Sequence, residues 1–326
     1  MSDPYAFTLY ETGGPDVLQA APIDLPRPGA GQLLVRNEAV GLNFIDTYHR
    51  SGLYKLPLPS GLGNEGAGVV EAVGEGVTEF REGQRVGYFT GPLGAYATHR
   101  LVDADRLVHL PDWLSAEDAA ATMLKGCTVE YLVERCASIV EGEPVLVHAA
   151  AGGVGSILVP WLKAIGGVVI AHAGDSRKAA LARELGADHA LCCPLDELAA
   201  EVRGLTGGKG VPVVLDGVGA DSWSASLGSV ARRGLIVTYG NASGPVPPFS
   251  ALDLLAAGSI FVTRPTLADY CPNAEESRKS AARLFEMIER KCVPVRIGAR
   301  FPLLEAAEAH AAIESRATTG STVLIP

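Results

Sequence analysis

The segment Ala150–Gly155, which reads AAGGVG, has the residue types and spacing that bind a dinucleotide. It follows the Gly-x-Gly-x-x-Gly pattern with alanine in the first glycine position. Its glycines allow a tight turn and a close approach to a pyrophosphate, to which the following helix presents free N–H groups. Because an apolar strand precedes the turn and a helix and a second strand follow it, we expect Gly152, Gly153 and Val154 to contact a dinucleotide.

The end of the next expected strand indicates which dinucleotide is bound. NAD enzymes place an acidic residue there for the ribose hydroxyls, whereas this chain has Ala173 or Gly174, followed by Arg177 and Lys178. Space and positive charge suit a 2′-phosphate, so the pattern predicts NADPH. Asp175 leaves an alternative open, since its carboxylate either accepts ribose hydroxyls, as in NAD enzymes, or caps the next helix, which we favour.

The elements that position these residues alternate regularly from about Glu143 to Pro265. Strands are expected at 144–149, 167–174, 212–219 and 234–241, and helices at 156–166, 176–187 and 220–234. This order predicts an α/β fold with a doubly wound parallel sheet covered by helices on both faces.

The regions on either side have a different pattern. The first 110 residues contain short apolar runs separated by turn residues, which predicts a β-rich structure. Residues 112–140 have a helical period, with a break expected near Lys125–Gly126, and a further helix is expected over 275–292. We therefore expect one domain over 1–122, completed by 266–326, and a second over 123–265.

Composition excludes several classes of function. The chain has 326 residues, enough for two domains, and a formal net charge of −10 without a block of Lys or Arg, so nucleic acid is not an expected partner. No apolar run approaches the roughly 20 residues of a membrane span, and the start, MSDPYAFTLY, does not resemble a secretory signal. We expect a cytoplasmic protein that does not enter a membrane. Six scattered cysteines without a Cys-x-x-Cys pair predict neither a disulfide framework nor a four-thiolate zinc site.

Several motifs together resemble those of one family. They are GLNFIDTYHRSGLY, LPSGLGNEGAG, LKGCTVEYL, HAAAGGVG, YGNASGP, FVTRPTL and ESRATTGSTVLIP. The chain is similar along its length to the NADPH-dependent quinone oxidoreductases, the zeta-crystallin-like branch of the medium-chain dehydrogenase/reductase superfamily. The resemblance implies a GroES-like catalytic domain, an inserted Rossmann domain and an active site between them. It also implies homodimers joined through the cofactor domains and reduction of quinones or related conjugated carbonyls.

The resemblance also implies site residues. On the substrate side, Asn43, Asp46, Tyr48 and Tyr54 match the family motif, and Thr128 lies in the segment expected near the nicotinamide. The expected cofactor contacts are Asn43, Gly152, Gly153, Val154, Gly174, Arg177, Lys178, Gly240, Asn241, Phe261, Thr263 and Arg316. Arg316 would supply a third cation to the 2′-phosphate. Where relatives often have a tyrosine beside that phosphate, this chain has Cys193, so we expect a softer preference for NADPH over NADH.

The segment GLGNEGAGVV, at 61–70, resembles the Gly-His-Glu-x-x-Gly signature of zinc-dependent alcohol dehydrogenases of the same superfamily. Asn64 stands in the place of the histidine ligand and Asn43 in that of the first catalytic cysteine, which leaves Glu65 alone. A neutral amide is a poor zinc ligand, and the loop of four cysteines is missing between residues 85 and 100. We therefore expect no metal, and a structural role for Asn64 and Glu65.

The expected chemistry needs no Lewis acid, because hydride addition to a quinone gives an oxyanion that is delocalised over a ring and that hydrogen-bond donors can stabilise. Tyr48 and Tyr54 are expected to donate to a planar substrate or stack on it, Asn43 to orient a carbonyl or ribose group, and Asp46 to be a structural hydrogen-bonding residue rather than a general base. Two alternatives remain open. One is an enone or alkenal reductase of the same fold, and the other is an NADPH-binding structural or RNA-interacting protein.

Overall fold

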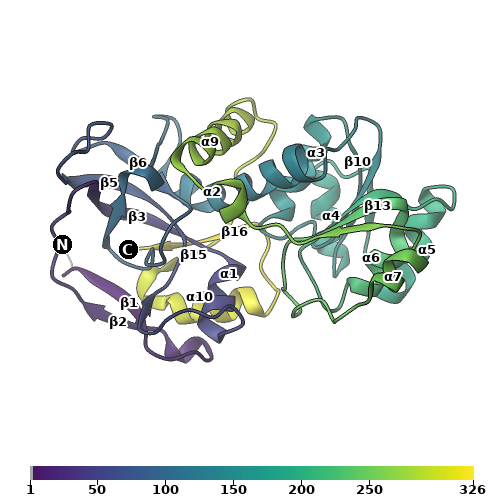
Figure 1. Cartoon of the computed structure of the whole chain (residues 1–326), viewed down its shortest axis with the longest axis horizontal. Helices are drawn as coiled ribbons and strands as arrows, with labels where there is room; N and C mark the ends of the chain where they lie inside the picture. The colour runs from purple at the N-terminus through teal and green to yellow at the C-terminus, as the bar shows by residue number, and fades with distance from the viewer. Residues whose placement is uncertain (1–2) are drawn as a thin grey trace. The chain divides into compact units, whose positions relative to one another are not determined.

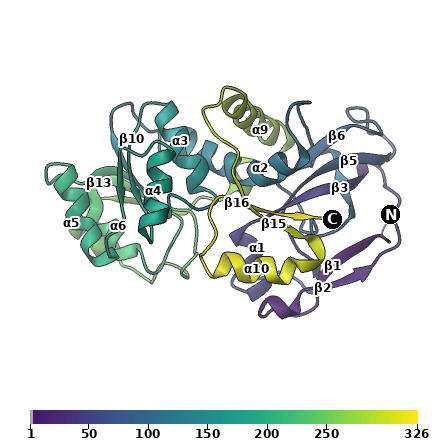
Figure 2. The same ribbon diagram turned by 180° about the vertical axis from the view of Figure 1, so that it is seen from behind.

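The computed structural model describes residues 3–326, which divide into two compact units (Figures 1 and 2). The first unit comprises the chain up to Cys127 together with Tyr270–Glu286 and Val295–Pro326. The second comprises Thr128–Asp269 and Met287–Pro294. The domain boundaries expected from the sequence, at 122/123 and 265/266, differ from the limits of these units and remain a prediction.

The second unit is built on a parallel sheet of six strands. Its strands are β9 (Pro144–Val147), β10 (Val168–His172), β11 (His189–Leu191), β12 (Val211–Asp216), β13 (Val230–Thr238) and β14 (Phe261–Thr263). Their spatial order is β11-β10-β9-β12-β13-β14, so the direction of winding reverses between β9 and β12. Open α/β sheets bind ligands beside such a reversal, at the carboxyl ends of the strands. The expected doubly wound parallel sheet is confirmed.

Helices follow the strands of this unit. They are α3 (Gly155–Ala164), α4 (Ser176–Glu184), α5 (Leu195–Leu205), α6 (Trp223–Ser229) and α7 (Ala251–Ala256). Three consecutive residues of β9, Val145, Leu146 and Val147, are buried, which requires cover on both faces of the sheet. Leu146 packs in a cluster with Leu198 of α5 and Trp223 of α6, which places α5 and α6 on its face. β13 begins at Val230, four residues earlier than the sequence pattern indicated.

The first unit is β-rich, as expected. A sheet of three strands contains β1 (Tyr5–Leu9), β2 (Gln19–Pro22) and β4 (Ser60–Gly61). A sheet of seven strands contains β3 (Gln32–Leu42), β5 (Glu65–Val73), β6 (Arg85–Tyr88), β7 (His99–Asp103), β8 (Val108–His109), β15 (Ile297–Pro302) and β16 (Ser321–Ile325). β16 pairs antiparallel with β3, with Thr322 opposite Leu42, so the end of the chain completes a sheet that begins near its start.

The remaining α-helices are α1 (Phe44–Ser51), α2 (Ala116–Glu130), α8 (Leu267–Tyr270), α9 (Ala274–Glu289) and α10 (Ala306–Glu314). Short 3₁₀ turns lie at Pro15–Val17 (η1), Ala104–Arg106 (η2) and Leu303–Glu305 (η4), and a π-helical segment at Tyr131–Cys136 (η3). Among residues 3–326, no helix combines the length and the apolar character that crossing a bilayer would require.

The helix break expected near Lys125–Gly126 is absent, because α2 runs without interruption from Ala116 to Glu130. Helix packing, and not a helix break, accounts for the glycine at position 126. A Cβ there would overlap the side chain of Leu284 on α9. The glycine therefore permits close packing of two helices, and the helical geometry changes only after Glu130.

Candidate active site

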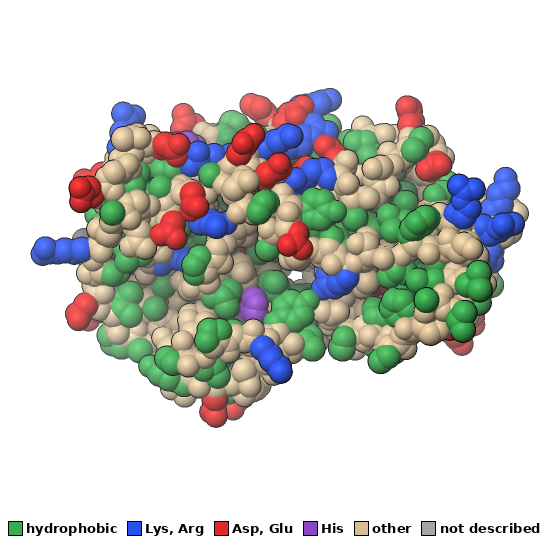
Figure 3. All heavy atoms as spheres, in the orientation of Figure 1, with side chains coloured by type: hydrophobic (Ala, Val, Ile, Leu, Met, Phe, Trp, Pro, Cys, Tyr) green, Lys and Arg blue, Asp and Glu red, His purple; other side chains and the backbone are tan. Residues whose placement is uncertain are grey.

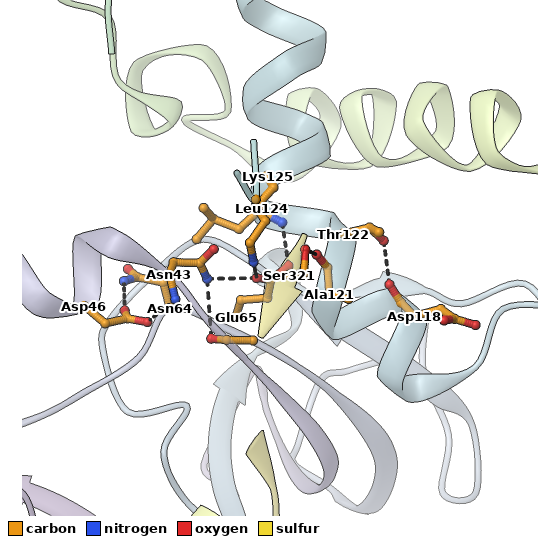
Figure 4. A network of polar contacts seen from close by, with 12 residues as sticks. Asn43, Asp46, Asn64, Glu65, Asp118, Ala121, Thr122, Leu124, Lys125 and Ser321 are labelled. Carbon is orange, nitrogen blue, oxygen red and sulfur yellow. Dashed lines mark hydrogen bonds and ion pairs between the residues drawn. The ribbon is translucent and has the colours of Figure 1, made fainter. Parts of the chain in front are cut away.

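A buried carboxylate, Glu65, lies at the centre of a polar cluster in the first unit (Figure 4). The side-chain amide nitrogen of Asn43 donates to its Oε2 over 2.9 Å, and the backbone N–H of Leu124 donates to Oε1 over 2.6 Å. Lys125 Nζ lies 3.7 Å from Oε2. Burial raises the pKa of Glu65, while the Lys125 charge and these hydrogen bonds act in the opposite direction. The carboxylate thus meets a cation and two donors inside the unit.

Three elements bring this cluster together. Asn43 precedes the first turn of α1, Glu65 opens β5, and Lys125 lies on α2. Gly41, at the end of β3, lets them approach, since a Cβ at this position would overlap the Glu65 carboxylate and the carbonyl of Ala120. A larger residue at 41 would therefore separate α2 from the carboxylate.

Asp46 forms a second buried centre beside the first. Its Oδ2 accepts from the backbone N–H of Asn43 at 2.9 Å and from the Tyr96 hydroxyl at 3.2 Å, and its Oδ1 accepts from the Asn64 side chain at 3.0 Å. Burial raises the pKa of Asp46 to about 7 although all three donors favour the charged form, as does Lys125. Asn43 and Asn64 are thereby held by the same carboxylate.

The tyrosines expected on the substrate side lie together. The rings of Tyr48 and Tyr54 are 5.3 Å apart and steeply inclined, and the ring of Phe44 lies 6.4 Å from that of Tyr48. The backbone N–H of Tyr54 donates to the carbonyl of Tyr48 at 3.0 Å. The structure therefore gathers Asn43, Tyr48 and Tyr54, with Asp46, around α1 and the turn after it.

In the second unit, the expected cofactor residues gather at the carboxyl edge of the sheet. Gly152, Gly153 and Val154 join β9 to α3, Gly174 follows β10, Gly240 and Asn241 follow β13, and Thr263 ends β14. The backbone is close-packed at the turn, because a Cβ on Gly155 would overlap the carbonyls of Ala149 and Ala150. Gly174 has open space around its Cβ position. These features fit a turn that approaches a pyrophosphate and a strand end that leaves room for a ribose.

Asp175 is the N-cap of α4, as favoured from the sequence. Its Oδ1 accepts from the backbone N–H of Lys178 at 2.8 Å, and Lys178 Nζ lies 3.9 Å from Oδ2. The remaining expected contacts are dispersed. Arg316 and Asn43 belong to the first unit, Thr128 to the second, and Phe261 is 64% exposed on the edge strand β14. The expected site residues are thus divided between the two units.

Sequence comparison identifies the family. Residues 29–112 match the alcohol dehydrogenase GroES-like domain, and residues 153–285 match the zinc-binding dehydrogenase domain. A quinone oxidoreductase of Pseudomonas aeruginosa is 50% identical over 315 residues, which cover 96% of this chain and 97% of that protein. The chain belongs to the quinone oxidoreductase family. The resemblance seen in its motifs is confirmed, together with the GroES-like and Rossmann folds.

Other relatives show the range of the family. The structure of the Escherichia coli quinone oxidoreductase complexed with NADPH superimposes with a TM-score of 0.96 at 43% identity, covering 99% of this chain and all of that one. A 2-haloacrylate reductase of a Burkholderia species is 41% identical over 98% of both chains. Quinone oxidoreductases and a 2-haloacrylate reductase are therefore both similar to this protein.

Two groups in the first unit of this quinone oxidoreductase family member were not anticipated from the sequence. Lys125 reaches Glu65 from α2, and the signal that could have identified it is a lysine placed between the apolar residues Met123 and Cys127, both of which are buried. Tyr96 contacts Asp46 from the segment before β7, and no sequence pattern relates these two residues. Both groups depend on packing between distant parts of the chain.

The donor set does not fit zinc. Asn43 and Asn64 both direct an amide N–H toward a carboxylate, and an N–H donor has no lone pair to offer a metal. Across the part of the chain that the structure describes, no three His, Cys, Asp or Glu side chains are grouped as metal ligands. Despite the name of the matching domain, the residues present are arranged as a hydrogen-bonded cluster.

Proposed function

We propose that this protein is an NADPH:quinone oxidoreductase, which transfers hydride from NADPH to a quinone without zinc. The observation that carries the proposal is a glycine-rich turn at the carboxyl edge of a doubly wound sheet, in a chain similar over its length to a quinone oxidoreductase complexed with NADPH. The reaction takes NADPH, a proton and a quinone to NADP⁺ and a hydroquinone. When bound, NADPH supplies the hydride, and the protein supplies orientation and charge stabilisation.

We assign cofactor binding mainly to the second unit. The backbone of Gly152, Gly153 and Val154 and the start of the ten-residue helix α3 receive the pyrophosphate. Arg177 and Lys178 flank the open space at Gly174 and receive the 2′-phosphate, which Asp175 does not contest because it caps α4. From the family resemblance, we further assign Thr128, Gly240, Asn241, Phe261, Thr263 and Arg316 to cofactor contacts.

We assign substrate binding to the residues around α1. Tyr48 and Tyr54 supply aromatic surface and phenolic donors to a planar ring, and Asn43 orients a carbonyl or ribose group, fixed by its bond to Glu65. Lys125 contributes a buried ammonium beside Asn43 and stabilises the negative charge that develops on the substrate oxygen. Asp46 positions Asn43 and does not act as a base, since its oxygens are already engaged by three donors.

We propose a cytoplasmic homodimer joined through the second unit. β14 is an edge strand, and large apolar side chains are exposed on or near α7 and β14, namely Phe249, Leu252, Leu255 and Phe261. Figure 3 shows hydrophobic side chains gathered over the part of this unit where Figure 1 labels α7. An unpaired edge beside an apolar patch favours pairing with a second copy of the same edge.

A second candidate function is the reduction of a conjugated carbonyl, favoured by the similarity to a 2-haloacrylate reductase. Hydride would then add to the β-carbon, and the enolate oxygen would take the place of the quinone oxygen beside Asn43 and Lys125. Both reactions need a flat site lined by donors.

The test compares NADPH oxidation with 1,4-benzoquinone, an alkenal and a 2-haloacrylate at equal concentrations. We expect the largest kcat/KM with the quinone. Negligible quinone turnover beside rapid alkenal or haloacrylate turnover would replace the first function by the second. NADPH binding without oxidation by any of the three would favour a non-enzymatic, structural or RNA-interacting role.

A further inference from the structure

A chain of buried hydrogen bonds runs from Asp46 to the surface of the first unit. The Tyr96 hydroxyl lies 3.2 Å from Asp46 Oδ2 and 2.9 Å from His310 Nε2. His310 Nδ1 lies 3.4 Å from Arg50 Nη1, and Arg50 forms a two-point contact with Glu314, at 3.0 and 2.6 Å. Asp46, Tyr96 and His310 are completely buried and Arg50 is 3% exposed. The chain connects α1 with α10, which lie side by side in Figures 1 and 2.

Chemistry gives this chain one direction. Arg50 can only donate, so His310 Nδ1 must accept and the ring proton must lie on Nε2. His310 Nε2–H then donates to the Tyr96 oxygen, which leaves the Tyr96 proton for Asp46. The two ends of the imidazole ring therefore require the same neutral tautomer.

This direction favours the ionised form of Asp46, against the burial that raises the pKa of this carboxyl group. Its Oδ2 receives protons from Tyr96 and from the Asn43 backbone, and its Oδ1 receives one from Asn64. A neutral carboxyl group would bring a fourth proton to a site that contains only donors. That O–H group would have no acceptor inside the protein, which is costly for a buried donor.

The chain is not a path for protons to solvent. Proton transfer along it is blocked at the Arg50 guanidinium, which keeps its proton at any ordinary pH and has no lone pair to accept another. What the chain does is orient the Tyr96 hydroxyl so that it donates its proton to Asp46 Oδ2.

We propose that Tyr96 and His310 are positioning residues, which hold the Asp46 carboxylate in the orientation that fixes Asn43 and Asn64. Arg50 and Glu314 anchor this support by setting the tautomer of His310. The effect of Tyr96 and His310 on the ionisation of Asp46 can be tested without any enzymatic reaction. Their effect on catalysis rests on the function proposed for Asn43.

Other titratable groups lie on α1 and on the elements near it, and the test must separate their effects. They are His49 and Arg50 on α1, Glu65 on β5, Lys125 on α2, and His310 and Glu314 on α10. Lys125 favours the carboxylate through its charge without contacting the Tyr96 hydroxyl chain. Removal of the Tyr96 hydroxyl leaves all these charges in place.

The experiment compares Tyr96→Phe with Tyr88→Phe in the full-length protein. Tyr88 is an apt control because its ring is equally buried in the same unit and its hydroxyl donates to Asn37, at 2.8 Å, away from Asp46. The first readout is the ¹³C shift of the Asp46 carboxyl across pH, identified with Asp46→Asn, which requires no turnover. We expect the midpoint to rise by about one pH unit in Tyr96→Phe, corresponding to one lost hydrogen bond to a charged group, and to stay unchanged in Tyr88→Phe.

The second readout is kcat/KM for benzoquinone against pH. In Tyr96→Phe we expect the acidic limb to move upward with the carboxyl midpoint and the value at neutral pH to fall about ten-fold. His310→Gln keeps an N–H donor near the Nε2 position and should recover most of this activity, whereas His310→Leu should not.

Each outcome is decisive. An Asp46 midpoint equal to that of the parent in Tyr96→Phe would overturn the proposal, whatever the activity. A shifted midpoint without quinone turnover in the parent would leave the positioning of Asp46 intact and refute the proposed function. Equal activity of His310→Gln and His310→Leu would show that His310 only fills space.

Discussion

The side-chain amide nitrogen of Asn43 lies 2.9 Å from Glu65 Oε2, the same oxygen that Lys125 Nζ approaches at 3.7 Å. Asn43, which stands in the place of the first catalytic cysteine of zinc-dependent alcohol dehydrogenases, is thus the donor of a hydrogen bond to the neighbouring glutamate. A metal at this place would have to break that bond and face an ammonium group. The positive charge beside this carboxylate is that of Lys125.

Removal of metals should therefore leave the enzyme unchanged. We expect dialysis against a chelator to preserve kcat/KM for the quinone and added Zn²⁺ not to raise it, because the amide groups offer no ligand set. Elemental analysis of the purified protein checks the same point. Stoichiometric zinc whose loss abolishes activity would contradict it.

Loss of Lys125 should destabilise the protein through Glu65. Lys125→Met leaves a completely buried carboxylate without its cation, which we expect to lower the free energy of unfolding by about 3–5 kcal/mol. The double variant with Glu65→Gln should recover most of this loss. Urea denaturation measures both, with Lys279→Met, at an exposed position of α9, as the control.

The single variant Lys125→Met and the double variant with Glu65→Gln also distinguish an effect on stability from an effect on catalysis. If Lys125 stabilises the developing oxyanion, the stable double variant should still have a kcat lower by about 10²–10³-fold. Recovery of both stability and kcat in the double variant would show that Lys125 only neutralises Glu65.

Asp46 and His310 should give opposite pH dependences of stability. The pKa of Asp46 rises on folding from 3.8 to about 7, so the folded state binds the extra proton and stability falls as pH rises through this interval. Burial lowers the pKa of His310 from 6.5 to about 3, so the unfolded state binds the proton and stability increases as pH rises over that interval. The two effects offset each other between about pH 4 and 6.5.

Single substitutions should separate the contributions of Asp46 and His310 to the pH dependence of stability. Over this range Asp46→Asn should make the free energy of unfolding rise more steeply with pH, and His310→Gln should make it fall, each by at most about 1.4 kcal/mol per pH unit. Urea titrations at several pH values measure these slopes. Slopes identical to that of the parent in both variants would contradict the assigned ionisation states.

The preference for NADPH should depend on the proposed phosphate cations. Lys178→Ala and Arg316→Ala should each raise KM for NADPH about ten-fold or more while leaving KM for NADH nearly unchanged, because only NADPH has the 2′-phosphate. Lys209→Ala is the control, since Lys209 is exposed near the amino ends of the strands. An equal loss for both cofactors would mean that the two cations act elsewhere.

The substitution Cys193→Tyr tests separately whether Cys193 weakens the preference for NADPH over NADH. If the tyrosine of relatives contributes a hydrogen bond to the phosphate, this substitution should raise the ratio of kcat/KM for NADPH over NADH, by about three- to ten-fold for one neutral donor. An unchanged ratio would remove Cys193 from the cofactor site.

The apolar surface near β14 should control assembly. Leu252→Glu combined with Phe261→Glu places two charges at residues that are 71% and 64% exposed, and should convert a dimer into monomers in light scattering. Leu304→Glu, at a position 61% exposed in the first unit, should have no effect. A dimer that persists in the double variant would place the interface elsewhere.

Local signals predicted the second unit well. The order of strand, glycine turn and helix lies within short windows, and the Ala150–Gly155 turn is explained by its immediate neighbours. The same reasoning failed at Gly126, where the local tendency of glycine to interrupt helices was outweighed by packing against Leu284. It also did not anticipate α1 and α10, which are joined by polar contacts such as those of Arg50 with His310 and Glu314.

The sequence by itself determined the family, the doubly wound fold, and the absence of the usual zinc ligands at positions 43 and 64, because these follow from residue type and local spacing. Only the tertiary structure decided how the remaining polar residues are paired. Asn43, Glu65 and Lys125 come from three elements, and Tyr96 meets His310 across 214 residues of chain. Such pairs form because a buried charge must find its partners wherever packing brings them, and no local pattern records that requirement.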